Sequence, residues 1–278
     1  MIIRNDIPIL EYDTSSPEVI APDHDNPEMK LPETCVLAFL GAVVDAYALE
    51  HDADVADEFI TVSHSFPMYV LHDPDMALIQ VPIGAPAAAQ VIDVAIGHGC
   101  RKIIAVGSCG VLTDIEENAF LVPVKALRDE GTSYHYLPAA RIIEPDEQAV
   151  SAIETTFKEL ELPYEECMTW TTDGFFRETK DMVAARVQEG CSCVEMECAA
   201  LCAVAQKRGA QFGEFFFTAD SLANVHEYDA RNFGYGSHEK ALELAIRIAE
   251  NWKNNEKRHV LIFQEYQESF PRFFQNRV

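Results

Sequence analysis

The chain is 278 residues long and 48% hydrophobic, and its formal net charge is −25 because 46 Asp and Glu outnumber 21 Lys and Arg. This length suits one large domain or two small ones, and the hydrophobic fraction suits a substantial core. The negative field repels nucleic-acid backbones and anionic membranes, so neither is an expected partner. It also opposes an anionic substrate unless basic groups gather locally.

The start of the chain and its cysteines indicate a cytoplasmic protein. Asp6, Pro8 and Glu11 interrupt any signal-peptide pattern, and no apolar run reaches the roughly 20 residues of a membrane helix. Eight cysteines without a C-x-x-C pair are typical of small buried hydrophobic residues in a reducing compartment, although a metal site or a disulfide is an alternative. We expect no cofactor and no metal.

The chain order of predicted elements indicates an α/β fold. Residues 1–33, rich in Pro, Asp and Glu, are expected to form an irregular arm, and residues 254–278 an aromatic tail that packs on the body or on a neighbouring subunit. Predicted strands span 35–40, 68–71, 77–81, 101–106, 119–127, 166–171, 191–196 and 212–219. Predicted helices span 85–99, 145–160, 180–189, 197–208 and 238–252. Without a repeat or linker, residues 34–253 read as a single α/β domain with a parallel or mixed sheet.

Two acids follow consecutive strands that look buried. Glu197 follows the strand 191–196, and Asp220 follows the strand 212–219. An unpaired charge entering a core costs several kcal/mol, so such acids usually have partners or a chemical role. Ligands of open α/β sheets bind beyond the carboxyl ends of strands, where both acids fall. The pattern predicts a small-molecule enzyme.

Two other segments are candidate parts of this site. Gly107-Ser108-Cys109-Gly110 is predicted to be a turn after the strand 101–106, which can present backbone N–H groups and a hydroxyl to an oxyanion. A plain tight turn is the alternative. Phe175 and Phe176 follow the strand 166–171 and serve either as core packing or as a platform on which a ring stacks.

Taken together, these motifs resemble the nucleoside phosphorylase family. The likeness rests on Val194–Glu197 with its Ala-rich helix, Gly107–Gly110, Asp129–Ser133 and Asp220, and it covers roughly residues 34–252. That family includes hexameric bacterial purine nucleoside phosphorylases, uridine phosphorylases and related nucleosidases. The resemblance implies a single domain with a central mixed, barrel-like sheet flanked by helices. It also implies a role in nucleoside metabolism and purine salvage, and a homodimer or a hexamer built as a trimer of dimers.

The resemblance also implies roles for residues around a nucleoside. Glu197 would accept hydrogen bonds from the 2′- and 3′-hydroxyls of ribose, a diol that suits a carboxylate with two acceptor oxygens. Met196 would pack against the sugar and Glu195 would flank it. Phe175 would stack on the base, next to Phe176.

Further implied roles concern the leaving base and the attacking group. Asp220 would protonate a purine at N7, Arg231 would assist it, and Ser108 beside Gly107 would contact phosphate. An aspartic acid with the ordinary pKa near 3.9 is ionised at pH 7, so this role requires burial among Phe215–Phe217 to raise the pKa of Asp220.

The phosphate site departs from the family pattern. The family uses three arginines, but the first of these positions falls at Asp45, shortly after Gly41, and the second at Ala105. The third comes from a neighbouring subunit, in a segment corresponding to residues 57–70, and no Lys or Arg occurs between Leu31 and Cys100.

Two explanations for this departure remain open. The first is that other cations bind phosphate, and the candidates are Arg4, Arg128, Arg177 and Arg231. The second is that water attacks, with Asp45 as its base unless Asp45 is simply a solvated helix residue. We predict phosphorolysis to free base and ribose-1-phosphate, with a hydrolytic nucleosidase or a non-catalytic nucleoside-binding protein as alternatives.

Overall fold

The structure is a computed structural model that describes the backbone of residues 1–269 and the side chains of residues 1–254. Its strands are β1 (Ile2–Ile3), β2 (Tyr12–Asp13), β3 (Thr34–Ala38), β4 (Asp54–Ile60), β5 (Ser65–His72), β6 (Asp75–Gln80), β7 (Lys102–Val111), β8 (Phe120–Asp129), β9 (Ile142–Ile143), β10 (Tyr164–Thr172), β11 (Cys191–Glu195) and β12 (Gln211–Ser221). The α-helices are α1 (Ala42–Glu50), α2 (Ala85–Gly97), α3 (Ser133–Tyr136), α4 (Glu147–Glu159), α5 (Lys180–Gln188), α6 (Cys198–Arg208) and α7 (His238–Ser269), with short 3-10 turns η1 (Pro8–Leu10), η2 (Phe175–Arg177) and η3 (Tyr235–Ser237).

The large sheet closes on itself at one side. Its strand order is β11-β10-β8-β12-β7-β3-β6-β5-β4, and β11 also pairs with β7, so β7, β12, β8, β10 and β11 form a ring. β12 runs parallel to β7 but antiparallel to β8, which makes the sheet mixed. The prediction of a single α/β domain around a mixed, barrel-like sheet is therefore confirmed.

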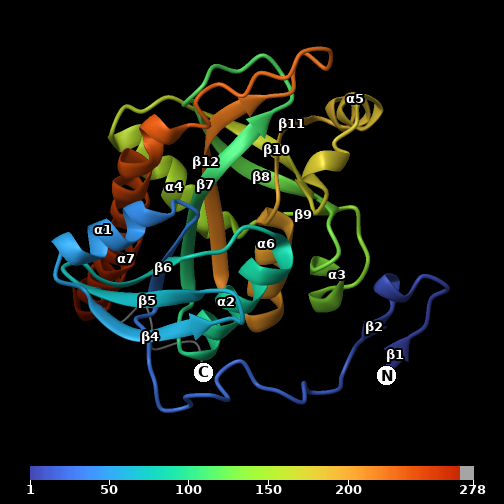
Figure 1. Cartoon of the computed structure of the whole chain (residues 1–278). Helices are drawn as coiled ribbons and strands as arrows, with labels where there is room; N and C mark the ends of the chain where they lie inside the picture. Colours follow the sequence, from blue (N-terminus) through green and yellow to red (C-terminus); the bar gives the residue numbers. More distant parts are fainter. Residues whose placement is uncertain (270–278) are drawn as a thin grey trace.

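Helices cover the sheet on both sides (Figure 1). Apolar residues of α2 and α6 pack with one face of β3 and β7 in one core cluster. Residues of α4 and α7 pack with the other face in a second cluster, together with Phe215 and Phe217 of β12. All eight cysteines are buried and free, as small hydrophobic residues would be.

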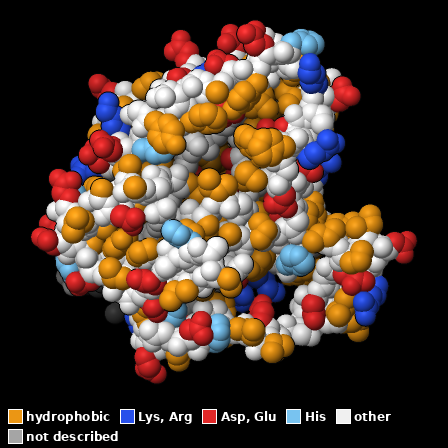
Figure 2. Space-filling view, viewed as in Figure 1, with side chains coloured by type: hydrophobic (Ala, Val, Ile, Leu, Met, Phe, Trp, Pro, Cys, Tyr) orange, Lys and Arg blue, Asp and Glu red, His pale blue; other side chains and the backbone are white. Residues whose placement is uncertain are grey.

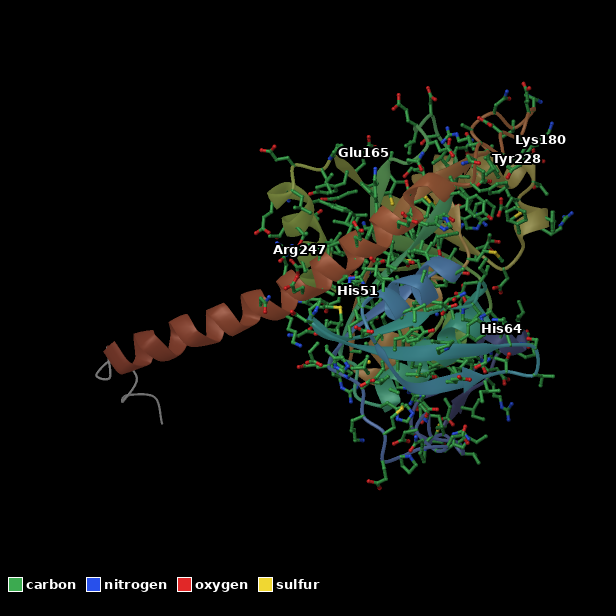
Figure 3. The ribbon with its side chains drawn as sticks, turned by 60° about the vertical axis from the view of Figure 1, so that its left-hand side comes forward. His51, His64, Glu165, Lys180, Tyr228 and Arg247 are labelled. Carbon is green, nitrogen blue, oxygen red and sulfur yellow. The ribbon has the colours of Figure 1, made fainter. Side chains whose placement is uncertain are left out.

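Two predicted boundaries are wrong. The segment Gly107–Gly110 is not a turn, because β7 runs on to Val111 while its backbone pairs with β12 and then with β11. The last helix does not end at Trp252 but continues to Ser269, since no Gly or Pro interrupts residues 253–269. Figure 3 shows α7 extending away from the body.

The sequence reading also missed α1 and β4, and it treated the arm as wholly irregular. The arm contains the short β1–β2 pair and η1, and it is mostly exposed, although residues 9–13 are half-buried and Leu31 is buried. The packing predicted for the tail 254–278 concerns side chains outside the described residues. Within the described part of the chain, no helix is long and apolar enough to cross a membrane.

Candidate functional site

The last residues of β7, β11 and β12 meet at one end of the barrel, around a cavity of about 370 Å³. We call it the inner cavity. It is lined by Phe39, Ile83, Gly107, Ser108, Cys109, Gly110, Phe175, Glu178, Val194, Glu195, Met196, Glu197, Glu214, Phe216, Asp220 and Phe233. The structure thus brings together the acid after β11 and the acid at the end of β12, as the sequence predicted.

The corner between β11 and α6 fixes Glu197 through backbone contacts. One carboxylate oxygen accepts a hydrogen bond from the Gly84 amide before α2, and the other accepts one from the Met196 amide at 3.2 Å. Glu197 is only 7% exposed. Burial first, and then the charge of Glu195, raise the pKa of Glu197 to about 8. Its carboxyl group therefore sits at the cavity wall with both oxygens positioned.

Glu195 has a different role, because its own acceptors are fully used. Its Oε1 accepts from the hydroxyls of Thr169 and Thr171 at 3.0 and 2.6 Å. Its Oε2 accepts from the amides of Glu197 and Cys198, both at 2.6 Å. Burial raises the pKa of Glu195 to about 7 against these hydrogen bonds, which lower it. Glu195 thus holds the corner that positions Glu197.

Asp220 is held by a tyrosine that the sequence reading missed. The hydroxyl of Tyr228 donates to Asp220 Oδ2 at 3.0 Å, and Asp220 is only 7% exposed. Arg231, expected to assist this acid, instead donates to the backbone carbonyls of Ile115 and Ala219 at 2.7 and 3.4 Å. It does not line the inner cavity.

A second space, the outer cavity, adjoins the first. It measures about 640 Å³ and is lined by Phe175, Phe176, Glu178, Thr179, Lys180, Val183, Asp220, Leu222, Asn224, Val225, Tyr228 and Phe233. Phe175, Glu178, Asp220 and Phe233 line both cavities. Figure 3 shows Lys180 and Tyr228 close together at this end of the molecule. Two adjoining cavities of this kind can hold a ligand made of two joined groups, one group in each cavity.

Phe175 and a further acid, Glu178, stand at the junction of the two cavities, and Phe176 lines the outer cavity alone. The rings of Phe175 and Phe176 meet edge to face with centroids 5.0 Å apart, and Phe176 is 93% exposed. Glu178 lies two residues after Phe176 and was missed by the sequence reading. Burial first, and then the charge of Asp220, raise the pKa of Glu178 to about 7. Close to neutral pH, Glu178 can therefore hold a proton next to Asp220.

The charged groups of the inner cavity are acids set among apolar residues and glycines. Its charged lining residues are Glu178, Glu195, Glu197, Glu214 and Asp220, and no Lys or Arg of the described residues lines it. Asp and Glu also dominate the charged groups on the face shown in Figure 2. An anion entering this space would therefore lose water without gaining an opposite charge.

The candidate phosphate-binding cations lie elsewhere. Arg128 donates to Ser133 Oγ and to the carbonyl of Pro138, both at 2.8 Å. Arg4 reaches Glu11 on the exposed arm, and Arg177 is exposed and lines neither cavity.

The structure also places the residues after β3 outside the site. Asp45 is exposed on α1 and accepts a hydrogen bond from the Tyr69 hydroxyl at 2.8 Å. Gly41 precedes the same helix with φ 61, and neither residue lines the inner cavity. The exposed Ser108 does line it, together with Gly107.

Gly110 of β7 allows close packing around Asp220. A Cβ at this position would lie 3.2 Å from Asp220 Oδ1, 3.1 Å from Leu222 Cδ1 and 3.2 Å from Val194 Cγ1. We expect Gly110→Ala to displace the carboxyl group of Asp220 and to reduce kcat about 10-fold, since small misplacements of reacting groups are costly. The control is Gly236→Ala, where a Cβ would meet nothing within 4 Å. Equal kcat values for the two variants would contradict this geometry.

The buried acids predict that stability decreases as pH rises. The pKa values of Glu195 and Glu197 are raised to about 7 and about 8, so between roughly pH 4.5 and 8 the folded chain binds more protons than the unfolded chain. The free energy of unfolding should then fall by up to about 1.4 kcal/mol per pH unit for each group. Urea unfolding of wild type and Glu197→Gln at pH 5 and pH 8 checks this. An equally steep decline in both proteins would contradict it.

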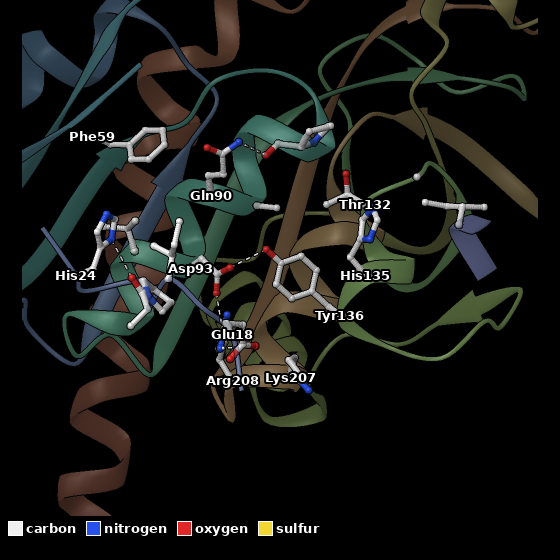
Figure 4. Close-up of a pocket in the computed structure, with 18 of the residues that line it drawn as sticks. Glu18, His24, Phe59, Gln90, Asp93, Thr132, His135, Tyr136, Lys207 and Arg208 are labelled. Carbon is white, nitrogen blue, oxygen red and sulfur yellow. Dashed lines mark hydrogen bonds and ion pairs between the residues drawn. The ribbon is translucent and has the colours of Figure 1, made fainter. Parts of the chain in front are cut away.

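A third cavity, of about 730 Å³, lies between the arm and the body (Figure 4). Three of its charged groups, Glu18, Asp93 and Arg208, pair with one another. Asp93 accepts from the Tyr136 hydroxyl at 2.6 Å and from Arg208 Nε at 2.7 Å, and Arg208 also contacts Glu18 at 3.2 Å. These contacts join α2, α3 and α6 to the arm, so we interpret this cavity as a structural seam rather than a reaction site.

The fold and the acid-lined cavity define an α/β protein with a small-molecule site at one end of its barrel. A sequence profile of the phosphorylase superfamily matches residues 34–252, and the chain belongs to that superfamily. A guanosine phosphorylase from Halorubrum lacusprofundi is 23% identical over 174 residues, which cover 61% of this chain and 72% of that protein.

Solved structures share the fold. AMP nucleosidase from Bacteroides thetaiotaomicron superposes with a TM-score of 0.69 at 20% identity, covering 84% of this chain and 97% of that chain. Purine nucleoside phosphorylase from Toxoplasma gondii gives a TM-score of 0.68 at 16% identity, covering 82% and 93% of the two chains. Phosphorylases and nucleosidases thus share this architecture, and the reaction mode must be argued from the site itself.

Proposed function

We propose that this protein hydrolyses the N-glycosidic bond of a purine nucleoside, with water rather than phosphate as the attacking group. The observation that carries the proposal is that Glu197 and Asp220 line one cavity whose charged lining, among the described residues, consists only of acids. The ribose would place its 2′- and 3′-hydroxyls on Glu197, and the base would extend towards Phe175 and the outer cavity. Asp220, held by Tyr228, would face the leaving base.

The charge changes during the reaction support this arrangement. Breaking the bond from C1′ to the base nitrogen develops positive charge on the sugar and negative charge on the base. The first charge favours ionisation of the carboxyl groups around the sugar, which then stabilise it, and a proton donor neutralises the second charge. Glu178 can retain a proton near pH 7 beside Asp220, so the two acids together supply the proton to the base. A dianionic phosphate would find no opposite charge among the described residues of this lining, and each acid that is ionised would repel it.

Phosphorolysis is the second candidate, because the relative from Halorubrum lacusprofundi is named a guanosine phosphorylase. It would require cations that the described cavity lining does not include, such as side chains from another copy of the chain.

The test incubates the protein with inosine, guanosine, adenosine, uridine and methylthioadenosine, with and without phosphate. Free base and ribose-1-phosphate are then measured. Equal release of purine base without phosphate supports hydrolysis, whereas release that requires phosphate and yields ribose-1-phosphate supports phosphorolysis. Binding without turnover would identify a non-catalytic nucleoside-binding protein.

We further propose that the chain forms a homodimer or a hexamer in the cytoplasm. Large hydrophobic side chains stand exposed on β4 and in the segments that follow β4 and β6, at Ile60 (74%), Val62 (112%) and Ile83 (76%). Ile83 also lines the inner cavity, so a second copy covering this region would help to close the site. Light scattering coupled to size exclusion measures the oligomer, and a monomer at micromolar concentration would contradict the proposal.

A further inference from the structure

One acid in the inner cavity has no assigned role. Glu214 lies on β12, is 1% exposed, and its Oε2 has no hydrogen-bond partner among the described residues. A buried carboxyl oxygen without a partner is costly, and in a cavity wall it is available to a ligand. Glu214 lines the inner cavity together with Glu197, Gly107 and Ser108.

Glu214 lies on the strand next to Gly107 and Ser108 of β7, the residues expected to contact the attacking group. In the β12–β7 register, Glu214 pairs with Ala105 and Phe216 pairs with Gly107. Side chains alternate along a strand, so Glu214 shares a face with Phe216, which also lines the cavity. Ala105 is small and uncharged, so β7 supplies no cation next to this acid.

We propose that Glu214 binds the attacking water and accepts its proton. This inference rests on the proposed hydrolysis. The water oxygen forms a bond to C1′, and the bond from C1′ to the base nitrogen breaks with its electron pair going to the base. One water proton passes to the ionised Glu214 carboxylate, and the base receives a proton from the Asp220–Glu178 pair. The products are ribose and free base, and the charges balance.

The surroundings of Glu214 make it a stronger proton acceptor than an ordinary glutamate. Burial first, and then the charges of Glu195 and Glu197, raise the pKa of Glu214 well above its ordinary value, while a hydrogen bond with Cys198 lowers it. A raised pKa makes a carboxylate a stronger proton acceptor. The positive charge that develops on the sugar favours the ionised form during the reaction.

The first experiment compares wild type with Glu214→Gln, which keeps the shape but cannot accept the proton. We expect kcat for inosine hydrolysis to fall about 10²-fold, at the lower end of acid–base effects because bonding to the nucleophile is weak in such transition states. The dissociation constant for inosine, measured by calorimetry, should stay within about 2-fold. A kcat within about 3-fold of wild type would overturn the proposal.

The second experiment uses azide, which attacks without needing a base. In Glu214→Ala, azide should raise base release and yield ribosyl azide, because a negative charge and a side chain have been removed from the attacking side. A general loss of structure would not produce this rescue. Azide that fails to accelerate Glu214→Ala would also overturn the role.

The wild-type assay distinguishes a failure of the proposed hydrolysis from a failure of the role proposed for Glu214. Base release that depends strictly on phosphate would overturn the proposed hydrolysis itself, and with it the role of Glu214. Release that does not need phosphate, combined with an unimpaired Glu214→Gln, would overturn only the assignment of Glu214.

Discussion

Asp220→Asn should slow purine nucleoside cleavage by about 10²–10⁴-fold, the usual contribution of a positioned proton donor. The amide keeps the size of the side chain and can still contact the hydroxyl of Tyr228, but it cannot pass an acidic proton to the base. Single-turnover rates on inosine, with binding measured separately, assign the loss to the chemical step.

The matched control for this variant is Asp181→Asn. Asp181 is exposed on α5 and lines neither cavity. Its kcat should equal that of wild type. Near-normal purine turnover in Asp220→Asn would refute the assigned role of Asp220 and leave Glu178 as the donor to be tested.

Glu197→Gln should reduce kcat/KM for ribosides by about 10²-fold at pH values above the Glu197 pKa of about 8. There the group is a carboxylate, and hydrogen bonds to a charged group contribute about 1.5–3 kcal/mol each. A 2′-deoxyriboside already lacks one of the two hydroxyls that Glu197 would bind, so its loss should be about 10-fold. The ratio between inosine and 2′-deoxyinosine therefore reports the contact with the diol directly.

Glu165→Gln is the control for this measurement, since Glu165 is exposed on β10, away from both cavities (Figure 3). Equal losses on inosine and 2′-deoxyinosine in Glu197→Gln would count against the diol assignment. They would indicate instead that Glu197 serves the corner of β11 and α6, where it already contacts the Gly84 amide.

Much of the fold was predictable because the pattern is local. Alternating strands and helices identified the class, and the glycine that ends α6, Gly209 at φ 72, is visible in the sequence. The predicted turn at Gly107–Gly110 failed for a non-local reason. Glycine and serine usually break strands, but pairing with β12 and β11 keeps this segment extended, and that pairing depends on closure of the barrel.

Two acids of the site could be predicted from local sequence patterns, whereas the residues around them could not. Glu197 and Asp220 stood out because each follows an apolar strand. Tyr228 and Glu178 lie in connecting segments with no periodic pattern, so only the folded chain shows that they meet Asp220. Glu214 could have been identified from the sequence, because it is a single acid inside the apolar run 212–219.

The central claim is that one cavity binds the pentose at Glu197 while Asp220 faces the leaving base. A crystal structure with a bound, uncleavable purine nucleoside analogue tests it most directly. We predict the 2′- and 3′-hydroxyls within hydrogen-bond distance of Glu197, and the purine ring between Phe175 and Asp220. An analogue bound in the cavity under the arm, or one whose sugar and base contact neither acid, would contradict the account.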